Sequence, residues 1–222
     1  MLILGIDDAG RGPLIGPMIL AGVLITKPQE QAIKKAGAKD SKLLVHSLRI
    51  ELSKVIKQNS ISEKIIKVYP QEIDSSKNLN TLEAKKSAEI INSLNTKKDK
   101  IEVIVDCPST NIPAWTKTLI SFIEHKDNLT IKCEHKADVN HPSVSAASIL
   151  AKVAREEEVE KIKKQYGNIG SGYPSDPETK DFLKTHGKQL ASSGIFRKSW
   201  ATWKNLFPAQ NENKKQKTLA DF

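Results

Sequence analysis

Two adjacent carboxylates, Asp7 and Asp8, follow the first apolar run of the sequence, residues 2–6. A short apolar run bounded by turn signals predicts a buried strand, and the glycines and proline of residues 10–13 predict its end. Because neighbouring side chains of a strand point to opposite faces, we expect the backbone to turn away at Asp8 so that both carboxylates converge. Like charges held together favour a cation between them, and oxygen ligands favour Mg²⁺ or Mn²⁺. A solvated Asp-Asp turn is the alternative for this pair taken alone.

Two further aspartates stand at the ends of predicted strands. Asp106 closes the apolar run that starts at residue 101, and Asp138 follows the strand predicted over residues 129–135. If both strands run parallel to the first, all these carboxylates reach one edge of the sheet, where ligands of open α/β sheets gather. Four converging carboxylates in a basic protein indicate two metal ions and phosphodiester chemistry. Taken singly, each aspartate could instead cap a helix or a turn.

The elements that would position these side chains alternate between strands and helices, with a tight Gly-Pro turn joining the first two strands as an antiparallel hairpin. This order predicts an α/β domain with a mixed five-stranded sheet flanked by helices and a helical C-terminal portion. The buried first turns of the long helix are rich in small residues, which allow close packing against the sheet. We expect strands at residues 2–6, 17–25, 61–69, 101–106 and 129–135, helices at 44–56 (capped by Asp40 or Ser41), 82–94, 112–123, from 142 past 164, 177–185 and 196–207, and polar segments at 29–39 and 71–78.

Composition narrows the class of protein. The 35 Lys and Arg residues exceed the 26 Asp and Glu residues, and the net charge of +9 suits a polyanionic partner, nucleic acid first, unless the whole proteome is rich in lysine. The two cysteines, Cys107 and Cys133, form neither a zinc motif nor a disulfide framework. The first six residues are too short for a signal peptide, and the uncharged stretch 12–26 is too short for a membrane span. We expect a soluble, cytoplasmic monomer with one catalytic domain over residues 1–207 and a flexible tail over residues 208–222.

Seven segments of the chain, in this order and spacing, resemble the type 2 ribonucleases H (ribonuclease HII), in an archaeal-like form. The segments are Gly-Ile-Asp-Asp-Ala-Gly-Arg-Gly-Pro at 5–13, Asp-Ser-Lys-Leu-Leu at 40–44, Val-Asp at 105–106, Lys-Ala-Asp at 136–138, Ser-Ala-Ala-Ser-Ile at 145–149, Gly-Ser-Gly-Tyr-Pro-Ser-Asp-Pro at 170–177 and Arg-Lys-Ser-Trp at 197–200. The resemblance implies a ribonuclease H-like fold. It also implies cleavage of RNA in RNA–DNA hybrids and at ribonucleotides embedded in duplex DNA.

The resemblance carries roles over to individual residues. Asp7, Asp8, Asp106 and Asp138 match the four metal-binding acidic positions of the family, and Asp7 is the candidate for bridging both ions. The implied mechanism is in-line attack of water on the phosphate 5′ to a ribonucleotide, leaving a 3′-hydroxyl and a 5′-phosphate. One divalent ion, Mg²⁺ or Mn²⁺, would activate the water and the other would stabilise the leaving oxygen.

Substrate contacts are implied in the same way. Gly10, Arg11 and Gly12 resemble the loop that reads the ribose 2′-hydroxyl, and glycine permits such close approach. Tyr173 resembles the tyrosine that packs at the junction between ribonucleotide and deoxyribonucleotide, although without the resemblance a packed turn residue is the simpler interpretation. The candidate phosphate contacts, each of which could instead be a solvated polar side chain, are Lys42, Asn80, Lys136, Lys152, Arg155 and Arg197.

One position departs from the family pattern, because Asp8 stands where glutamate is usual. The shorter side chain loses roughly 1.5 Å of reach, which predicts an altered metal preference, favouring Mn²⁺, rather than loss of the site. A module that binds hybrids without cleaving them is the alternative from another class. Ribonuclease HIII would need an additional domain before the first strand, and an Asp-x-Asp phosphatase would need aspartate where Ala9 stands.

The C-terminal tail carries a second motif. Gln216, Leu219 and Phe222 resemble the Gln-x-x-Leu-x-x-Phe motif that binds sliding clamps of the archaeal or eukaryotic type. In a short helical turn, the leucine and phenylalanine would enter an apolar pocket of the clamp. The alternative is a tail that matches the motif by chance.

Overall fold

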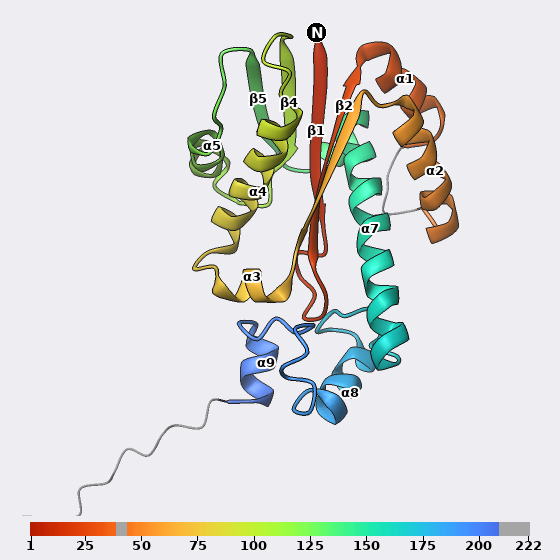
Figure 1. Ribbon diagram of the computed structural model, residues 1–222, viewed down its shortest axis with the longest axis vertical. Coiled ribbons are helices and arrows are strands. Elements are labelled where there is room, and N and C mark those ends of the chain that lie inside the picture. The colour runs from red at the N-terminus through yellow and green to blue at the C-terminus, as the bar shows by residue number, and fades with distance from the viewer. Residues whose placement is uncertain (39–43, 209–222) are drawn as a thin grey trace, which may run out of the picture.

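The computed structural model of the chain describes residues 1–38 and 44–208, and its centre is one five-stranded sheet (Figure 1). The strand order is β3-β2-β1-β4-β5. Strands β1 and β2, and β2 and β3, pair antiparallel, whereas β4 pairs parallel with both β1 and β5. The strands are β1 (Leu2–Ala9), β2 (Met18–Thr26), β3 (Ser62–Val68), β4 (Ile101–Asp106) and β5 (Leu129–Glu134). The predicted mixed sheet is therefore confirmed.

Helices cover both faces of this sheet (Figure 1). On one face, α4 (Leu79–Leu94) and α5 (Ile112–Ser121) pack over one apolar cluster. On the other face, α1 (Lys27–Lys35) and α2 (His46–Asn59) pack with α7 (Pro142–Tyr166) over a second cluster. The two clusters are apolar because alternate strand residues point to opposite faces and both faces are covered.

The first turns of α7 lie against the central strand, as their small residues predict. Ser143, Ser145 and Ser148 are almost fully buried. A Cβ atom on Gly5 of β1 would lie 2.2 Å from the carbonyl carbon of Ser143, so only glycine allows this approach. The close contact fixes the position of α7 relative to the end of β1.

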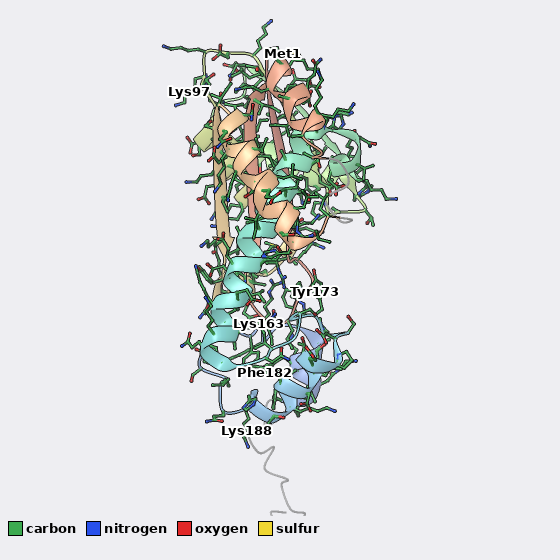
Figure 2. The ribbon with its side chains drawn as sticks, turned by 90° about the vertical axis from the view of Figure 1, so that its right-hand side faces the viewer. Met1, Lys97, Lys163, Tyr173, Phe182 and Lys188 are labelled. Carbon is green, nitrogen blue, oxygen red and sulfur yellow. The ribbon has the colours of Figure 1, made fainter. Side chains whose placement is uncertain are left out.

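A helical C-terminal portion packs around a third apolar cluster and lies below the carboxyl end of β1 in the view of Figure 1. It contains α8 (Pro177–His186) and α9 (Ala201–Leu206), and Figure 2 shows Phe182 within it. Leu14 and Ile15, from the connection between β1 and β2, are fully buried in the same cluster. The connection that follows the two adjacent aspartates is thus part of the C-terminal core.

Three local predictions are wrong. The predicted polar segment 29–39 contains α1, because Thr26 and Gln29 form a capping box and Ile33 is buried against the sheet. The predicted loop 71–78 contains a short helix, α3 (Pro70–Ser75), which starts at a proline, a favoured residue at that position. The helix predicted over 196–207 is only α9, because residues 195–197 instead bond to the connection between β1 and β2.

Helix α2 begins at His46, later than predicted, and the proposed caps Asp40 and Ser41 lie outside the described residues. Within α2, Leu52 and Ile56 are buried, whereas Leu48 is exposed. The remaining short helix, α6 (Ala137–Asn140), follows β5 and carries Asp138.

Candidate active site

Strand β1 continues through both aspartates to Ala9, so the prediction that the backbone turns away at Asp8 is wrong. Asp7 pairs with Ala21 and Asp8 with Leu20 in the ladder to β2. Strand alternation therefore directs Asp7 toward the face covered by α7 and Asp8 toward the face covered by α4. The surroundings agree, because Asp7 is hydrogen-bonded to Ser148 of α7 and the carboxylate that acts most strongly on Asp8 belongs to α4. The two carboxylates approach the site from different sides of the sheet.

The other two predicted aspartates lie at the carboxyl ends of the neighbouring parallel strands. The ladder between β1 and β4 ends at the pair Ile6 and Val105, and Asp7 and Asp106 come directly after it. The amide of Ala137 donates to Asp106 Oδ1 over 3.1 Å, which ties the start of α6 to the end of β4. Asp138, the next residue, is 5% exposed. The structure thus brings Asp7, Asp106 and Asp138 to one edge of the sheet.

Burial and mutual repulsion raise the pKa values of two of these carboxyls, Asp7 and Asp8. The pKa of Asp7 lies well above its usual value, first because of burial and then because of the charges of Asp8 and Asp106. Burial raises the pKa of Asp8 to about 7, helped by the charge of Glu83 and opposed by that of Arg11. A buried cluster of like charges is an environment in which a bound cation is strongly favoured.

Glu83 is an acidic residue of the site that sequence reasoning missed. It projects from α4, is 2% exposed, and accepts a hydrogen bond of 2.7 Å from Arg11 Nε. Burial raises its pKa, whereas Arg11 lowers it. Arg11 Nη2 also donates to Asn80 Oδ1, so Asn80, a predicted phosphate contact, holds this arginine in the folded chain. The spacing of three residues between Asn80 and Glu83, which places them on one helix face, is the only signal that the sequence offered.

A cleft of about 470 Å³ opens beside the strand end. Its walls come from the end of β1, the glycine-rich loop after it, α2, α7 and the loop before α8. The lining residues are Asp8, Ala9, Gly10, Arg11, Gly12, Arg49, Lys152, Arg155, Glu156 and Tyr173. Arg49 and Glu156, which form an ion pair, were not predicted from the sequence. A second cavity of the same volume, between α3 and α7, contains none of the predicted site residues.

Tyr173 is 40% exposed and lies where the C-terminal portion meets α7 (Figure 2). The guanidinium of Arg155 lies 5.4 Å from the centroid of its ring, and Arg155 Nη2 donates to the carbonyl of Ser171. Lys152 donates to Ser148 Oγ over 3.0 Å. A cleft with an exposed aromatic ring and four cationic side chains, those of Arg11, Arg49, Lys152 and Arg155, suits a nucleic acid.

The loop glycines differ in what they require. Gly10 has a φ of +79°, and a Cβ atom there would lie 2.3 Å from Arg155 Cδ, so both backbone conformation and space demand glycine. A Cβ atom on Gly12 would lie 3.6 Å from Tyr173, an ordinary contact. Glycine at position 12 is therefore not required by the folded chain itself, which leaves room there for close approach of a ligand.

Arg197 does not contact phosphate, because its side chain is fully buried. It donates to the carbonyl oxygens of Gly10, Arg11 and Gly16, and burial lowers its pKa to about 10, so it remains charged at neutral pH. Lys136 is exposed and has a φ of 58° at the start of α6. Lys42 and the predicted clamp residues Gln216, Leu219 and Phe222 lie outside the described residues.

The carboxylates have the chemistry of ligands for a divalent cation, although their side chains are not arranged as a complete coordination site. Among residues 1–38 and 44–208, no group of three or more His, Cys, Asp or Glu side chains is arranged to hold a metal ion. The donors at the sheet edge are nevertheless all oxygens, and burial and repulsion between carboxylates raise the pKa values of Asp7 and Asp8, which a bound cation would counteract. In the same described ranges, no helix is long and apolar enough to cross a membrane.

Comparison with known proteins identifies the family. The family described as Ribonuclease HII matches residues 4–203. Ribonuclease HII from Pyrococcus furiosus is 42% identical over 226 residues, covering 100% of this chain and 98% of the relative. The crystal structure of ribonuclease H2 from Pyrococcus horikoshii OT3 superimposes with a TM-score of 0.85 at 36% identity, covering 93% of this chain and 97% of the other.

A further relative was solved with a partner. The structure of the PCNA:RNase HII complex from Archaeoglobus fulgidus matches with a TM-score of 0.78 and 37% identity, covering 99% of this chain and 100% of that one. The fold, the carboxylates at the sheet edge and these similarities over nearly the whole length agree. The chain belongs to the ribonuclease HII family and is a type 2 ribonuclease H.

Proposed function

We propose that this enzyme hydrolyses the RNA strand of RNA–DNA hybrids and cuts on the 5′ side of ribonucleotides embedded in duplex DNA. The observation that carries the proposal is the meeting of Asp7, Asp106 and Asp138 at the carboxyl ends of β1, β4 and β5. The cationic cleft beside them supplies a surface for the phosphate backbone. The net charge of +9 favours association with a polyanion.

Asp7, Asp106 and Asp138 are the proposed ligands of the catalytic metal, with Asp8 contributing from the other face of β1. When bound, two Mg²⁺ or Mn²⁺ ions would polarise the attacking water and stabilise the leaving 3′-oxygen. The protein's own task is to hold the carboxylates in place. Ser148 holds Asp7, and the amide of Ala137 holds Asp106.

Recognition of the ribonucleotide is assigned to the loop of Gly10, Arg11 and Gly12 together with Tyr173. The 2′-hydroxyl distinguishes RNA from DNA, and backbone groups can read it where no side chain intervenes. The ring of Tyr173 provides an apolar surface in the lining of the cleft, and the guanidinium of Arg155 packs against it. Lys152 and Arg155 are the proposed phosphate contacts among the residues that line the cleft.

Asp8 is proposed to change the metal preference toward Mn²⁺. Its carboxyl starts from the α4 side of β1 and is one methylene shorter than the usual glutamate, so its reach toward the site is reduced. Mg²⁺ demands near-ideal octahedral geometry and tolerates such a change poorly. The alternative, a module that binds hybrids without cutting them, predicts affinity without cleavage.

The C-terminal residues Gln216, Leu219 and Phe222 are proposed to bind a sliding clamp. The support is the sequence motif itself and the relative from Archaeoglobus fulgidus, which was solved in complex with PCNA. Such tethering would raise the local concentration of the enzyme on replicated DNA.

The activity is tested by incubating the protein with end-labelled RNA–DNA hybrid, double-stranded RNA and double-stranded DNA, each with Mg²⁺ or Mn²⁺. We expect cleavage of the hybrid alone, with products that carry a 3′-hydroxyl and a 5′-phosphate. The variant Asp106→Asn, which keeps size and removes charge, should bind hybrid and fail to cut it. Tight binding of hybrid by the unmodified protein without cleavage in either metal would favour the binding module instead.

A further inference from the structure

The buried side chain of Arg197 lies against the loop formed by residues 10–16. Its Nη2 donates to the carbonyl of Gly10 over 2.6 Å, and its Nη1 donates to the carbonyl of Arg11 over 2.7 Å. Nε and Nη2 both donate to the carbonyl of Gly16, over 3.1 and 3.0 Å. One planar guanidinium thus satisfies carbonyl groups at both ends of the loop.

Neighbours of Arg197 bind other carbonyls of the same loop. Trp200 Nε1 donates to the carbonyl of Gly12 over 3.1 Å, and the amide of Arg197 donates to the carbonyl of Leu14 over 2.9 Å. The guanidinium also lies 5.1 Å from the centroid of the Trp200 ring. Segment 197–200 of the C-terminal portion is therefore the main anchor of the loop backbone.

The direction of these carbonyls fixes the direction of the loop's N–H groups. In a trans peptide unit, the C=O and the N–H of the next residue point opposite ways. Since the carbonyls of Gly10 and Arg11 point to Arg197, the N–H groups of Arg11 and Gly12 point away from it. These two N–H groups make no hydrogen bond within the described part of the chain, and both residues line the cleft.

We propose that Arg197 is a positioning residue that sets the enzyme's preference for ribonucleotides by aiming the N–H groups of Arg11 and Gly12 into the cleft. The inference rests on the proposed function, in which this loop meets the 2′-hydroxyl. Arg197 itself does not touch the substrate, because it is fully buried behind the loop. The C-terminal portion therefore contributes to substrate specificity through Arg197.

The side chain of Arg11 is held separately, by Glu83 and Asn80 of α4. Replacing Arg197 therefore releases the loop backbone without removing the anchor of the Arg11 side chain. Arg197→Lys is the informative variant, because it keeps charge and length but replaces the planar fork of donors by a single nitrogen. Trp200→Phe is a milder second variant, which keeps an aromatic ring beside Arg197 and removes the donor to the carbonyl of Gly12.

The experiment compares binding of two duplexes of one sequence, all-DNA or with a single ribonucleotide, in EDTA at a fixed salt concentration. Salt is fixed because backbone contacts make affinity strongly dependent on ionic strength. The matched control is Trp203→Phe, which perturbs the same C-terminal core through Phe196 but removes no hydrogen bond to the loop carbonyls. Melting temperatures of all variants report folding, and cleavage of the ribonucleotide duplex by the unmodified protein is measured in parallel samples that contain Mg²⁺ or Mn²⁺ in place of EDTA.

We expect Arg197→Lys to lose about five- to tenfold in affinity for the ribonucleotide duplex, the worth of one or two hydrogen bonds, while its affinity for all-DNA duplex changes by less than about twofold. Trp200→Phe should shift the preference in the same direction by less, and Trp203→Phe should keep it. Equal losses on both duplexes, or a preference unchanged in Arg197→Lys, would overturn the positioning role. So would the absence of any binding preference in the unmodified protein. Failure of the unmodified protein to cut the ribonucleotide duplex would instead refute the proposed function.

Discussion

Replacing Asp8 by asparagine should stabilise the metal-free protein at neutral and alkaline pH. The folded protein raises the pKa of this carboxyl from 3.8 to about 7, chiefly through burial and the charge of Glu83. The folded state therefore binds a proton that the unfolded state releases between pH 4 and 7, and stability falls as the pH rises through that range. Asparagine resembles the protonated carboxyl and has no charge to bury.

The magnitude follows from the size of the shift. A tenfold change in proton affinity corresponds to ~1.4 kcal/mol, and the pKa of Asp8 rises from 3.8 to about 7. Because Asp8 is half-buried, solvent screening reduces the effect of its charge. We therefore expect Asp8→Asn to raise the free energy of unfolding by about 2 to 4 kcal/mol above pH 7. The difference between variant and unmodified protein should be smallest near pH 4.

The assay is urea unfolding in EDTA at several pH values between 4 and 8, for the unmodified protein and for Asp8→Asn. Asp99→Asn is a matched control, since Asp99 is exposed and precedes β4 at the other end of the sheet. Added Mn²⁺ should narrow the gap, because a bound cation stabilises the site that contains charged Asp8 more than the site that contains asparagine. A difference in stability that does not change between pH 4 and 8 would refute the reasoning.

Four further predictions follow from the same contacts. Asp7→Asn should lower single-turnover cleavage at least about a thousandfold, since several kcal/mol of charge stabilisation are lost, and unchanged cleavage would exclude Asp7 from the site. Gly10→Ala should cost about 1 to 3 kcal/mol in urea unfolding, more than the control Gly37→Ala, which shares a positive φ but meets no neighbouring atom within 4 Å. Asp8→Glu should shift relative activity from Mn²⁺ toward Mg²⁺, whereas equal rates with both metals before and after the change would contradict the proposed role of Asp8. Deleting residues 216–222 should abolish binding to a cognate clamp in a pull-down while leaving cleavage intact, and clamp binding that survives the deletion would disprove the motif.

The sheet and the positions of three aspartates were predictable because local pattern and topology agree. Apolar runs ending in aspartate predict strands that stop at one edge, and parallel pairing of β1 with β4 and β4 with β5 brings Asp7, Asp106 and Asp138 there. The small residues at the start of α7 likewise predict the close approach to Gly5 that the structure contains.

Other features depend on contacts between residues far apart in sequence. Nothing in the neighbouring sequence distinguishes Arg197 from a surface arginine. Its side chain is buried because it packs against the loop after β1 and donates to carbonyls some 180 residues earlier in the chain. Glu83 looks like one more polar residue of a helix until α4 packs beside Arg11. The predicted direction of Asp8 is wrong because pairing with β2 continues the strand through Ala9. The glycines that follow indicate an earlier end of the strand, and nothing local in the sequence signals this pairing.

The most direct measurement uses a labelled DNA duplex that contains one ribonucleotide, incubated with Mg²⁺ or Mn²⁺ and mapped at nucleotide resolution. The account predicts a single cut on the 5′ side of the ribonucleotide, faster with Mn²⁺, and loss of the cut in Asp106→Asn. Cleavage elsewhere in the duplex, or no cleavage by the unmodified protein or by Asp8→Glu in either metal, would contradict it.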